Sequence, residues 1–144
     1  MTDYKEIIAV DFDGELVENG FPEIGEINEY VLEKMKQKKK EGAKIIIWTC
    51  RREHSEPGDE MKNFLLENDI PFDYINRNVP YLDFITSNKI FANQYWDDRG
   101  RDLLYEKELI SRLHEIRDSL LMKGVEKEVD DLMGLINDIK NYEM

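Results

Sequence analysis

The hydrophobic positions in the first hundred residues of this chain form short continuous runs separated by polar loops. Three such runs, rich in β-branched or aromatic side chains and ending at polar residues, lie at residues 7–10, 44–49 and 90–96. Runs of this kind are typical of strands buried on both faces of a parallel sheet. Residues 72–76 predict a shorter strand of the same sheet.

Between these runs, apolar residues recur at helical spacing. It predicts helices over residues 26–41 and 57–68, the first closed by Gly42, a residue typical of helix C-termini. The stretch before the last strand has weak periodicity, which predicts a loop around a short element at residues 81–85. Strands alternating with helices predict an α/β domain over residues 1–101, with a three-layer, Rossmann-like parallel sheet.

Residues 102–144 differ in character, because apolar residues recur there at alternating spacings of four and three. They are Leu109, Leu113, Ile116 and Leu120 before Gly124, and Val125, Val129, Leu132, Ile136 and Ile139 after it. This pattern predicts a C-terminal helical hairpin with a narrow apolar seam on each helix. The seams suit packing against the α/β domain and pairing with a second subunit equally well, so a homo-oligomer formed through these helices is one of two open alternatives.

Charge and composition narrow the class of partner. The formal net charge of −12 and the sequence pI near 4.6 argue against a general nucleic-acid surface, which needs clustered Lys and Arg. Residues 36–40 are basic, but they lie at a predicted helix C-terminus, where cations are favoured. No apolar run reaches the length of a membrane span, and Cys50 is the one cysteine, so we expect a cytoplasmic protein without a membrane partner.

Polar groups follow the ends of three predicted strands. They are Asp11 and Asp13 after the first, Thr49 at the end of the second, and Asp97 and Asp98 after the last, with Lys89 just before it. The carboxyl ends of parallel strands meet at the edge where α/β sheets bind ligands. Carboxylates gathered there repel one another unless a cation such as Mg²⁺ is bound, while lysine, hydroxyl and backbone amide groups suit a phosphate. The sequence therefore predicts metal-assisted phosphoryl transfer on a phosphorylated substrate.

In their order along the chain, these groups resemble the four motifs of the haloacid dehalogenase superfamily of phosphohydrolases. The matching segments are Asp-Phe-Asp-Gly-Glu at residues 11–15, Ile-Ile-Ile-Trp-Thr at 45–49, Lys89, and Tyr-Trp-Asp-Asp at 95–98. The resemblance runs from residue 7 to about residue 101. Because the lysine lies just before the acidic pair and no cap-sized insertion is present, small capless members resemble this chain most, which implies an open crevice.

The resemblance implies a role for each acid. Asp11 would attack phosphorus and become an aspartyl-phosphate, while Asp13 would protonate the leaving oxygen and then activate the hydrolytic water. Mg²⁺ would be held by Asp11, by the backbone carbonyl of Asp13 and by Asp97. Asp98 would bind the metal or orient its water.

The same resemblance assigns Thr49 and Lys89 to the substrate phosphate. An open crevice admits a phosphorylated metabolite, a nucleotide or a macromolecule, and the sequence does not choose among them. Arg51 and Arg52 follow Thr49 closely, so they either reach the substrate or lie in an exposed loop.

Single positions exclude other phosphate-handling classes. A Cys-dependent phosphatase needs an arginine six positions beyond Cys50, and that position is Glu56. Neither a Gly-x-Gly-x-x-Gly motif nor a Walker-type glycine loop is present, which argues against dinucleotide and NTP binding.

Glu15 departs from the family pattern, which usually has Thr or Val there. A fourth carboxylate beside metal and phosphate adds repulsion or supplies an extra ligand. The alternative function is therefore a catalytically weak or inactive metal- and phosphate-binding scaffold that associates through its C-terminal helices.

Overall fold

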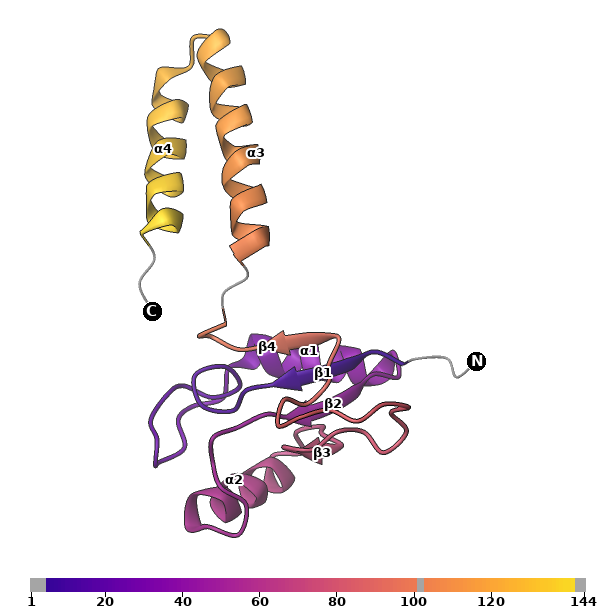
Figure 1. Cartoon of the computed structure of the whole chain (residues 1–144). Helices are drawn as coiled ribbons and strands as arrows, with labels where there is room; N and C mark the ends of the chain where they lie inside the picture. The colour runs from indigo at the N-terminus through magenta and orange to yellow at the C-terminus, as the bar shows by residue number, and fades with distance from the viewer. Residues whose placement is uncertain (1–4, 101–102, 142–144) are drawn as a thin grey trace. The chain divides into compact units, whose positions relative to one another are not determined.

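The computed structural model describes residues 5–100 and 103–141. The chain divides into two compact units, Met1–Gly100 and Arg101–Met144. The first is an α/β unit and the second is a pair of helices (Figure 1). Within the described residues, no helix combines the length and apolar character needed to cross a membrane.

A four-stranded parallel sheet forms the centre of the α/β unit (Figure 1). In the spatial order β3-β2-β1-β4, its strands are Tyr74–Ile75, Lys44–Ile47, Ile7–Val10 and Gln94–Trp96. Strand β1 is central, pairing Ile7 with Lys44 of β2 and Ile8 with Gln94 of β4. All of β1 is buried, as its continuous apolar run predicts. The predicted α/β class with a Rossmann-like parallel sheet is confirmed.

Two helices connect the first three strands, and each starts at a side-chain cap. Helix α1 spans Glu29–Lys40 after Asn28, whose side chain accepts a hydrogen bond from the Val31 N–H. It starts three residues later than the apolar spacing predicts because Asn28 takes the capping position. Helix α2 spans Glu56–Glu67 after Ser55, which caps it in the same way. Gly42 has a φ of +90°, so the glycine closes α1 as predicted.

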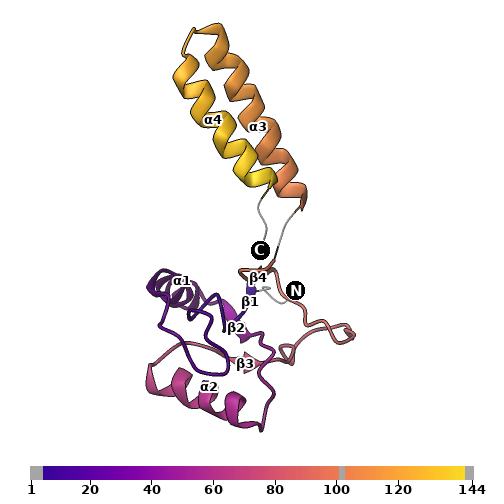
Figure 2. The same cartoon turned by 90° about the vertical axis from the view of Figure 1, so that its left-hand side faces the viewer.

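The two faces of the sheet are covered differently, as Figure 2 shows. Helices α1 and α2 pack on the face that carries Ile8, Val10 and Ile45. The other face is covered by the segment between β3 and β4, through Val79, Ile90 and Ala92. This follows from strand order, because right-handed connections that run in opposite directions along a parallel sheet lie on opposite faces.

The connection from β3 to β4 contains no helix. Residues 81–85 form turns and bends, so the short element predicted there is wrong. Its apolar side chains pack singly, with Leu82 and Phe91 against the sheet and Phe84 edge-on to Phe91, and form no periodic face. Without periodicity no helix can present a continuous apolar stripe to the sheet.

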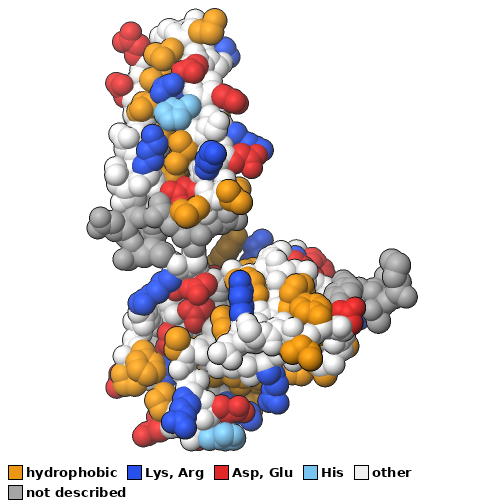
Figure 3. All heavy atoms as spheres, in the orientation of Figure 1, with side chains coloured by type: hydrophobic (Ala, Val, Ile, Leu, Met, Phe, Trp, Pro, Cys, Tyr) orange, Lys and Arg blue, Asp and Glu red, His pale blue; other side chains and the backbone are white. Residues whose placement is uncertain are grey.

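The second unit is the predicted helical hairpin. Helix α3 spans Leu103–Met122 and helix α4 spans Glu126–Lys140, with Gly124 at a φ of +74° between them. None of the residues of α3 is buried, and α4 buries Val129 and Ile136. Figure 3 shows hydrophobic side chains interspersed with charged ones on the hairpin. The seams are therefore only partly covered within the hairpin.

Candidate active site

The candidate site lies at the carboxyl ends of β1 and β4. The chain leaves β1 toward β2 and β3, and returns to the other side of β1 as β4. In α/β sheets such a reversal opens a crevice outside the strand ends, because the connections on its two sides diverge to opposite faces. Asp11 follows β1 and Asp97 follows β4, so they flank this crevice.

Three carboxylates meet there. Asp11, Asp97 and Asp98 each offer an oxygen, and these oxygens lie within 4.8 Å of one another. Gly14 makes the approach possible, because a Cβ built on it would lie 2.6 Å from a carboxylate oxygen of Asp98. Gly14 also has a φ of +92°, which disfavours other residues. The loop after β1 is thus shaped to admit the carboxylate that follows β4.

The electrostatics of this acid cluster suit a hard cation. Burial, reinforced by the charges of Asp97, Asp98 and Asp13, raises the pKa of Asp11 to about 7, although a hydrogen bond from the Phe12 N–H opposes the rise. A divalent cation would remove the repulsion that causes part of this shift. Three converging carboxylate oxygens are the donor type that Mg²⁺ binds, so the residues present fit the predicted metal.

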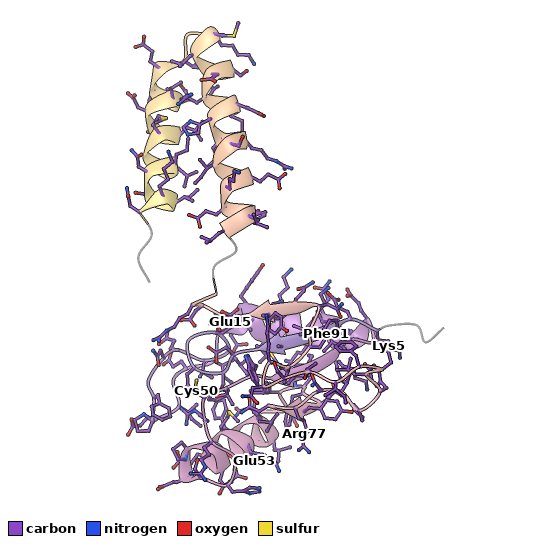
Figure 4. The ribbon with its side chains drawn as sticks, in the orientation of Figure 1. Lys5, Glu15, Cys50, Glu53, Arg77 and Phe91 are labelled. Atoms are coloured by element: carbon purple, nitrogen blue, oxygen red, sulfur yellow. The ribbon has the colours of Figure 1, made fainter. Side chains whose placement is uncertain are left out.

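Glu15 lies at the edge of the acid cluster. Burial and the charges of Asp98 and Asp97 raise the pKa of Glu15. Its side chain also lines a separate pocket of about 340 Å³ beside α1, together with Tyr30 and Trp96. Figure 4 shows Glu15 on the α1 and β4 side of the unit, away from Cys50. The charges of the acid cluster therefore act on Glu15, but its side chain borders a different pocket.

Asp13 is held by a buried arginine. Arg51 donates from Nε and Nη2 to the two carboxylate oxygens of Asp13, at 2.8 and 2.7 Å. The remaining donors of the guanidinium bind the carbonyls of Pro22, Pro57 and Glu23 at 3.0–3.2 Å. Among the described residues, Arg51 is the one charged side chain that is buried. Of the two alternatives for Arg51, the exposed loop is therefore wrong, whereas Arg52 is exposed.

Thr49 is fixed at the end of β2 by its backbone. Asn76 accepts a hydrogen bond from the Thr49 N–H at 2.8 Å and donates one to its carbonyl at 2.9 Å. The Thr49 hydroxyl oxygen accepts from the Arg51 N–H at 3.1 Å, which leaves its own proton to donate to an anion. Thr49 also lines the pocket that contains Asp11 and Asp97.

Lys89 lies elsewhere. Its ammonium group is 5.1 Å from the centroid of the Tyr95 ring, and its side chain is exposed. The Tyr95 hydroxyl is bound to the segment that covers the sheet, because it donates to the Ile90 carbonyl and accepts from the Ala92 N–H. Lys89 is not among the residues that line the crevice.

The crevice itself is a pocket of about 540 Å³. It brings together Asp11, Asp13, Thr49 and Asp97 of the predicted site. Its wall also contains Asn19, Phe21, Trp48, Cys50 and Arg99. Of these additional residues, Asn19 and Phe21 come from the part of the loop between β1 and α1 that follows the motif at residues 11–15. The pocket is therefore wider than the motif residues alone define.

Sequence reasoning did not pair Arg51 with Asp13. The signal was present in the register, because Val10 of β1 pairs with Ile47 of β2. Asp13 lies three residues beyond the first strand end and Arg51 four residues beyond the second. Opposite charges at nearly equal distances past neighbouring parallel strands are placed to meet. No comparable signal pointed to Phe21, whose position depends on the path of a loop.

Comparisons with known proteins show one informative similarity. No family model matches the chain, and no curated protein matches it. Among solved structures, the chain is similar to a conserved protein from Bacteroides thetaiotaomicron, with 31% identity and a TM-score of 0.58 over 74% of this chain and 90% of that one. A chain of the Pnkp1/Rnl/Hen1 complex matches with 21% identity and a TM-score of 0.42, over 76% of this chain and 35% of that one.

Proposed function

The chain belongs to the same protein family as the conserved protein from Bacteroides thetaiotaomicron, and from its own site we propose that it is a Mg²⁺-dependent phosphomonoesterase. The observation that carries the proposal is the convergence of Asp11, Asp97 and Asp98 at the switch point of the sheet. The order of motifs that resembles the haloacid dehalogenase superfamily supports it. The substrate is a phosphate ester, and the acidic charge of −12 favours a metabolite or nucleotide over a long polynucleotide.

The reaction would proceed in two displacements. A carboxylate oxygen of Asp11 attacks phosphorus, the bond from phosphorus to the leaving oxygen breaks, and that oxygen takes a proton and leaves as the alcohol. Water then attacks the aspartyl-phosphate, its proton passes to a base, and the bond from phosphorus to Asp11 breaks. The products are the alcohol and inorganic phosphate, and the Asp11 carboxylate is restored.

Asp13 is the group that would carry the proton in both steps. A carboxylate has about four lone-pair sites, and the guanidinium of Arg51 uses one on each oxygen. The remaining sites can hold the proton that passes to the leaving oxygen. The Asp13 side chain is 18% exposed, so it reaches the pocket while its orientation stays fixed.

Other groups of the chain would position the phosphate. The Thr49 hydroxyl donates to a phosphate oxygen. Mg²⁺, held by the acid cluster and the Asp13 backbone carbonyl, would supply charge neutralisation for the phosphate oxygens. The lysine of the family pattern stands at Lys89, which would have to leave the Tyr95 ring to reach the phosphate.

Turnover of a panel of phosphate esters with and without Mg²⁺ tests this function. Asp11→Asn removes the nucleophile with little change in shape, and we expect it to abolish turnover while circular dichroism and thermal unfolding stay native-like. Asp138→Asn, at an exposed position of α4, is the matched control and should retain turnover. Wild-type turnover by Asp11→Asn would show that another group attacks phosphorus.

The placement of Lys89 and Glu15 favours one second candidate, a catalytically weak scaffold that binds metal and phosphate. A scaffold would bind Mg²⁺ and inorganic phosphate, as measured by calorimetry, and would hydrolyse none of the esters. Mg²⁺-dependent turnover would exclude this candidate.

A further inference from the structure

The loop between β1 and α1 forms one wall of the pocket and is closed at its base. The Glu18 N–H donates to the Glu26 carbonyl at 2.8 Å, which closes the segment 18–26 within this loop. Gly25 passes so close to Glu18 that a Cβ on it would lie 2.1 Å from the Glu18 carbonyl oxygen. The segment between these residues is therefore a closed loop with a defined base.

Arg51 anchors the part of this loop that contains Pro22 and Glu23. It donates to the carbonyls of Pro22 and Glu23, both at 3.0 Å. The same guanidinium is bound to Asp13, so the loop and the candidate proton-transfer group are anchored to one buried side chain. Because Arg51 is 1% exposed, water competes little for these hydrogen bonds.

Phe21 belongs to this anchored loop, and its ring is exposed. The guanidinium carbon of Arg51 lies 5.1 Å from the centroid of the Phe21 ring and 5.2 Å from that of Phe12. Phe12 is fully buried, whereas Phe21 is 58% exposed. The cation therefore lies against two rings, and the outer ring keeps more than half of its surface open to solvent. An exposed aromatic ring supported in this way is pre-organised for contact with a ligand.

The pocket contains a second aromatic side chain from a different element. Trp48 follows β2 and packs against the cluster on the opposite face of the sheet from α1 and α2. Phe21 and Trp48 both line the pocket of about 540 Å³ that contains Asp11 and Asp97. This volume is within the range of pockets that hold small organic ligands. Both rings therefore border the same pocket as the candidate phosphate site.

We propose that Phe21 and Trp48 bind a planar ring in the leaving group of the substrate, so that the enzyme prefers phosphate esters whose alcohol carries an aromatic or heteroaromatic ring. This inference rests on the proposed phosphomonoesterase function. A ring in the alcohol stacks on the face of Phe21 that is turned away from Arg51, while the phosphate lies at Asp11. Asn19 and Arg99, which line the same pocket, add hydrogen-bond donors for polar ring substituents.

A matched pair of esters separates ring recognition from chemistry. Benzyl phosphate and cyclohexylmethyl phosphate have leaving groups of similar size and acidity, but only the first contains a planar ring. We expect wild-type enzyme to have a KM about 3- to 10-fold lower for benzyl phosphate, with similar kcat, because stacking acts on bound substrate and transition state alike. Phe21→Leu should bring the two KM values together, and Phe21→Tyr should keep them apart.

Tyr30→Leu is the control, because Tyr30 is an exposed ring on α1 that lines other pockets. Binding of both esters is also followed by tryptophan fluorescence in the Asp11→Asn variant, where Trp48 reports from the pocket wall. If wild-type enzyme hydrolyses neither ester but binds benzyl phosphate selectively, the proposed function fails and the ring site stands. Equal binding of both esters, or a preference that survives Phe21→Leu, overturns the ring site.

Discussion

Replacing Arg51 by methionine is expected to lower the unfolding free energy of the α/β unit by about 3–4 kcal/mol. Methionine keeps a long apolar side chain between Phe12 and Phe21 but removes every donor. The change leaves the Asp13 carboxylate and the carbonyls of Pro22, Glu23 and Pro57 without their hydrogen-bond donor. In the wild-type protein Arg51 binds these groups at 2.7–3.2 Å.

The magnitude follows from burial. Removing one partner of a buried ion pair costs about 3–5 kcal/mol, because the other charge stays partly desolvated. The Arg51 side chain is 0% exposed and the Asp13 side chain is 18% exposed, so water reaches the stranded carboxylate and the lower half of that range applies. Lysine at this position should rescue little, because a single ammonium group cannot reproduce a planar fork of five donors.

Urea denaturation followed by tryptophan fluorescence measures this loss. Both tryptophans, Trp48 and Trp96, belong to the α/β unit, so the signal reports on that unit and not on the hairpin. Arg52→Met is the matched control, since Arg52 is the exposed neighbour, and should change stability by at most about 0.5 kcal/mol. If both variants lose the same small amount, Arg51 is not the buried anchor described above.

Three further predictions concern the acids and the hairpin. Glu15→Thr should raise kcat/KM on a generic ester several-fold, because it removes about 1 kcal/mol of repulsion toward the phosphate, whereas a loss together with weaker Mg²⁺ dependence would show that Glu15 is a ligand. Burial and the charge of Asp97 raise the pKa of Asp11 from 3.8 to about 7 in the metal-free fold. The stability that protonated Asp11 contributes is therefore lost as the pH rises through about 7. Mg²⁺ should therefore raise the thermal unfolding midpoint more at about pH 8 than at about pH 5, and an equal rise at both would contradict this. We expect the partly covered hairpin to drive self-association, measured by light scattering. Ile116→Glu and Leu135→Glu, at hairpin positions that are 50% and 49% exposed, should weaken it. Ile85→Glu, at a 99% exposed position of the α/β unit, is the control and should not.

The sequence predicts those parts of the fold that depend on local periodicity. Buried runs such as residues 7–10 have few alternatives to a central parallel strand, and the spacing on both sides of Gly124 predicts the hairpin. Residues 81–85 were mispredicted because apolar residues in a loop can pack one by one without a period. The last strand is shorter than its apolar run, since Ile90 and Ala92 pack on the sheet face and only Gln94–Trp96 pairs with β1.

For the candidate site, motif order indicates which strand ends carry acids, and the structure gathers Asp11, Asp97 and Asp98 at one edge. The motifs do not indicate the direction in which each side chain points. Lys89 precedes Asp97 by eight positions in the sequence, but its side chain turns toward Tyr95. Arg51 looks like one of two loop arginines in the sequence, and only the path of the polypeptide shows that it is the buried one.

The position of β4 in the sheet has a consequence for the order in which the protein is synthesised. Strand β4 is the last strand of the unit to leave the ribosome, it lies at the edge of the sheet, and it pairs only with β1. Until it docks, the newly made chain can form β1, β2 and β3 with both helices, but one edge of β1 stays unpaired. Asp97 and Asp98 arrive with that final strand. A nascent chain that stops before residue 94 can therefore carry most of the core and still lack two of the three carboxylates at the sheet edge.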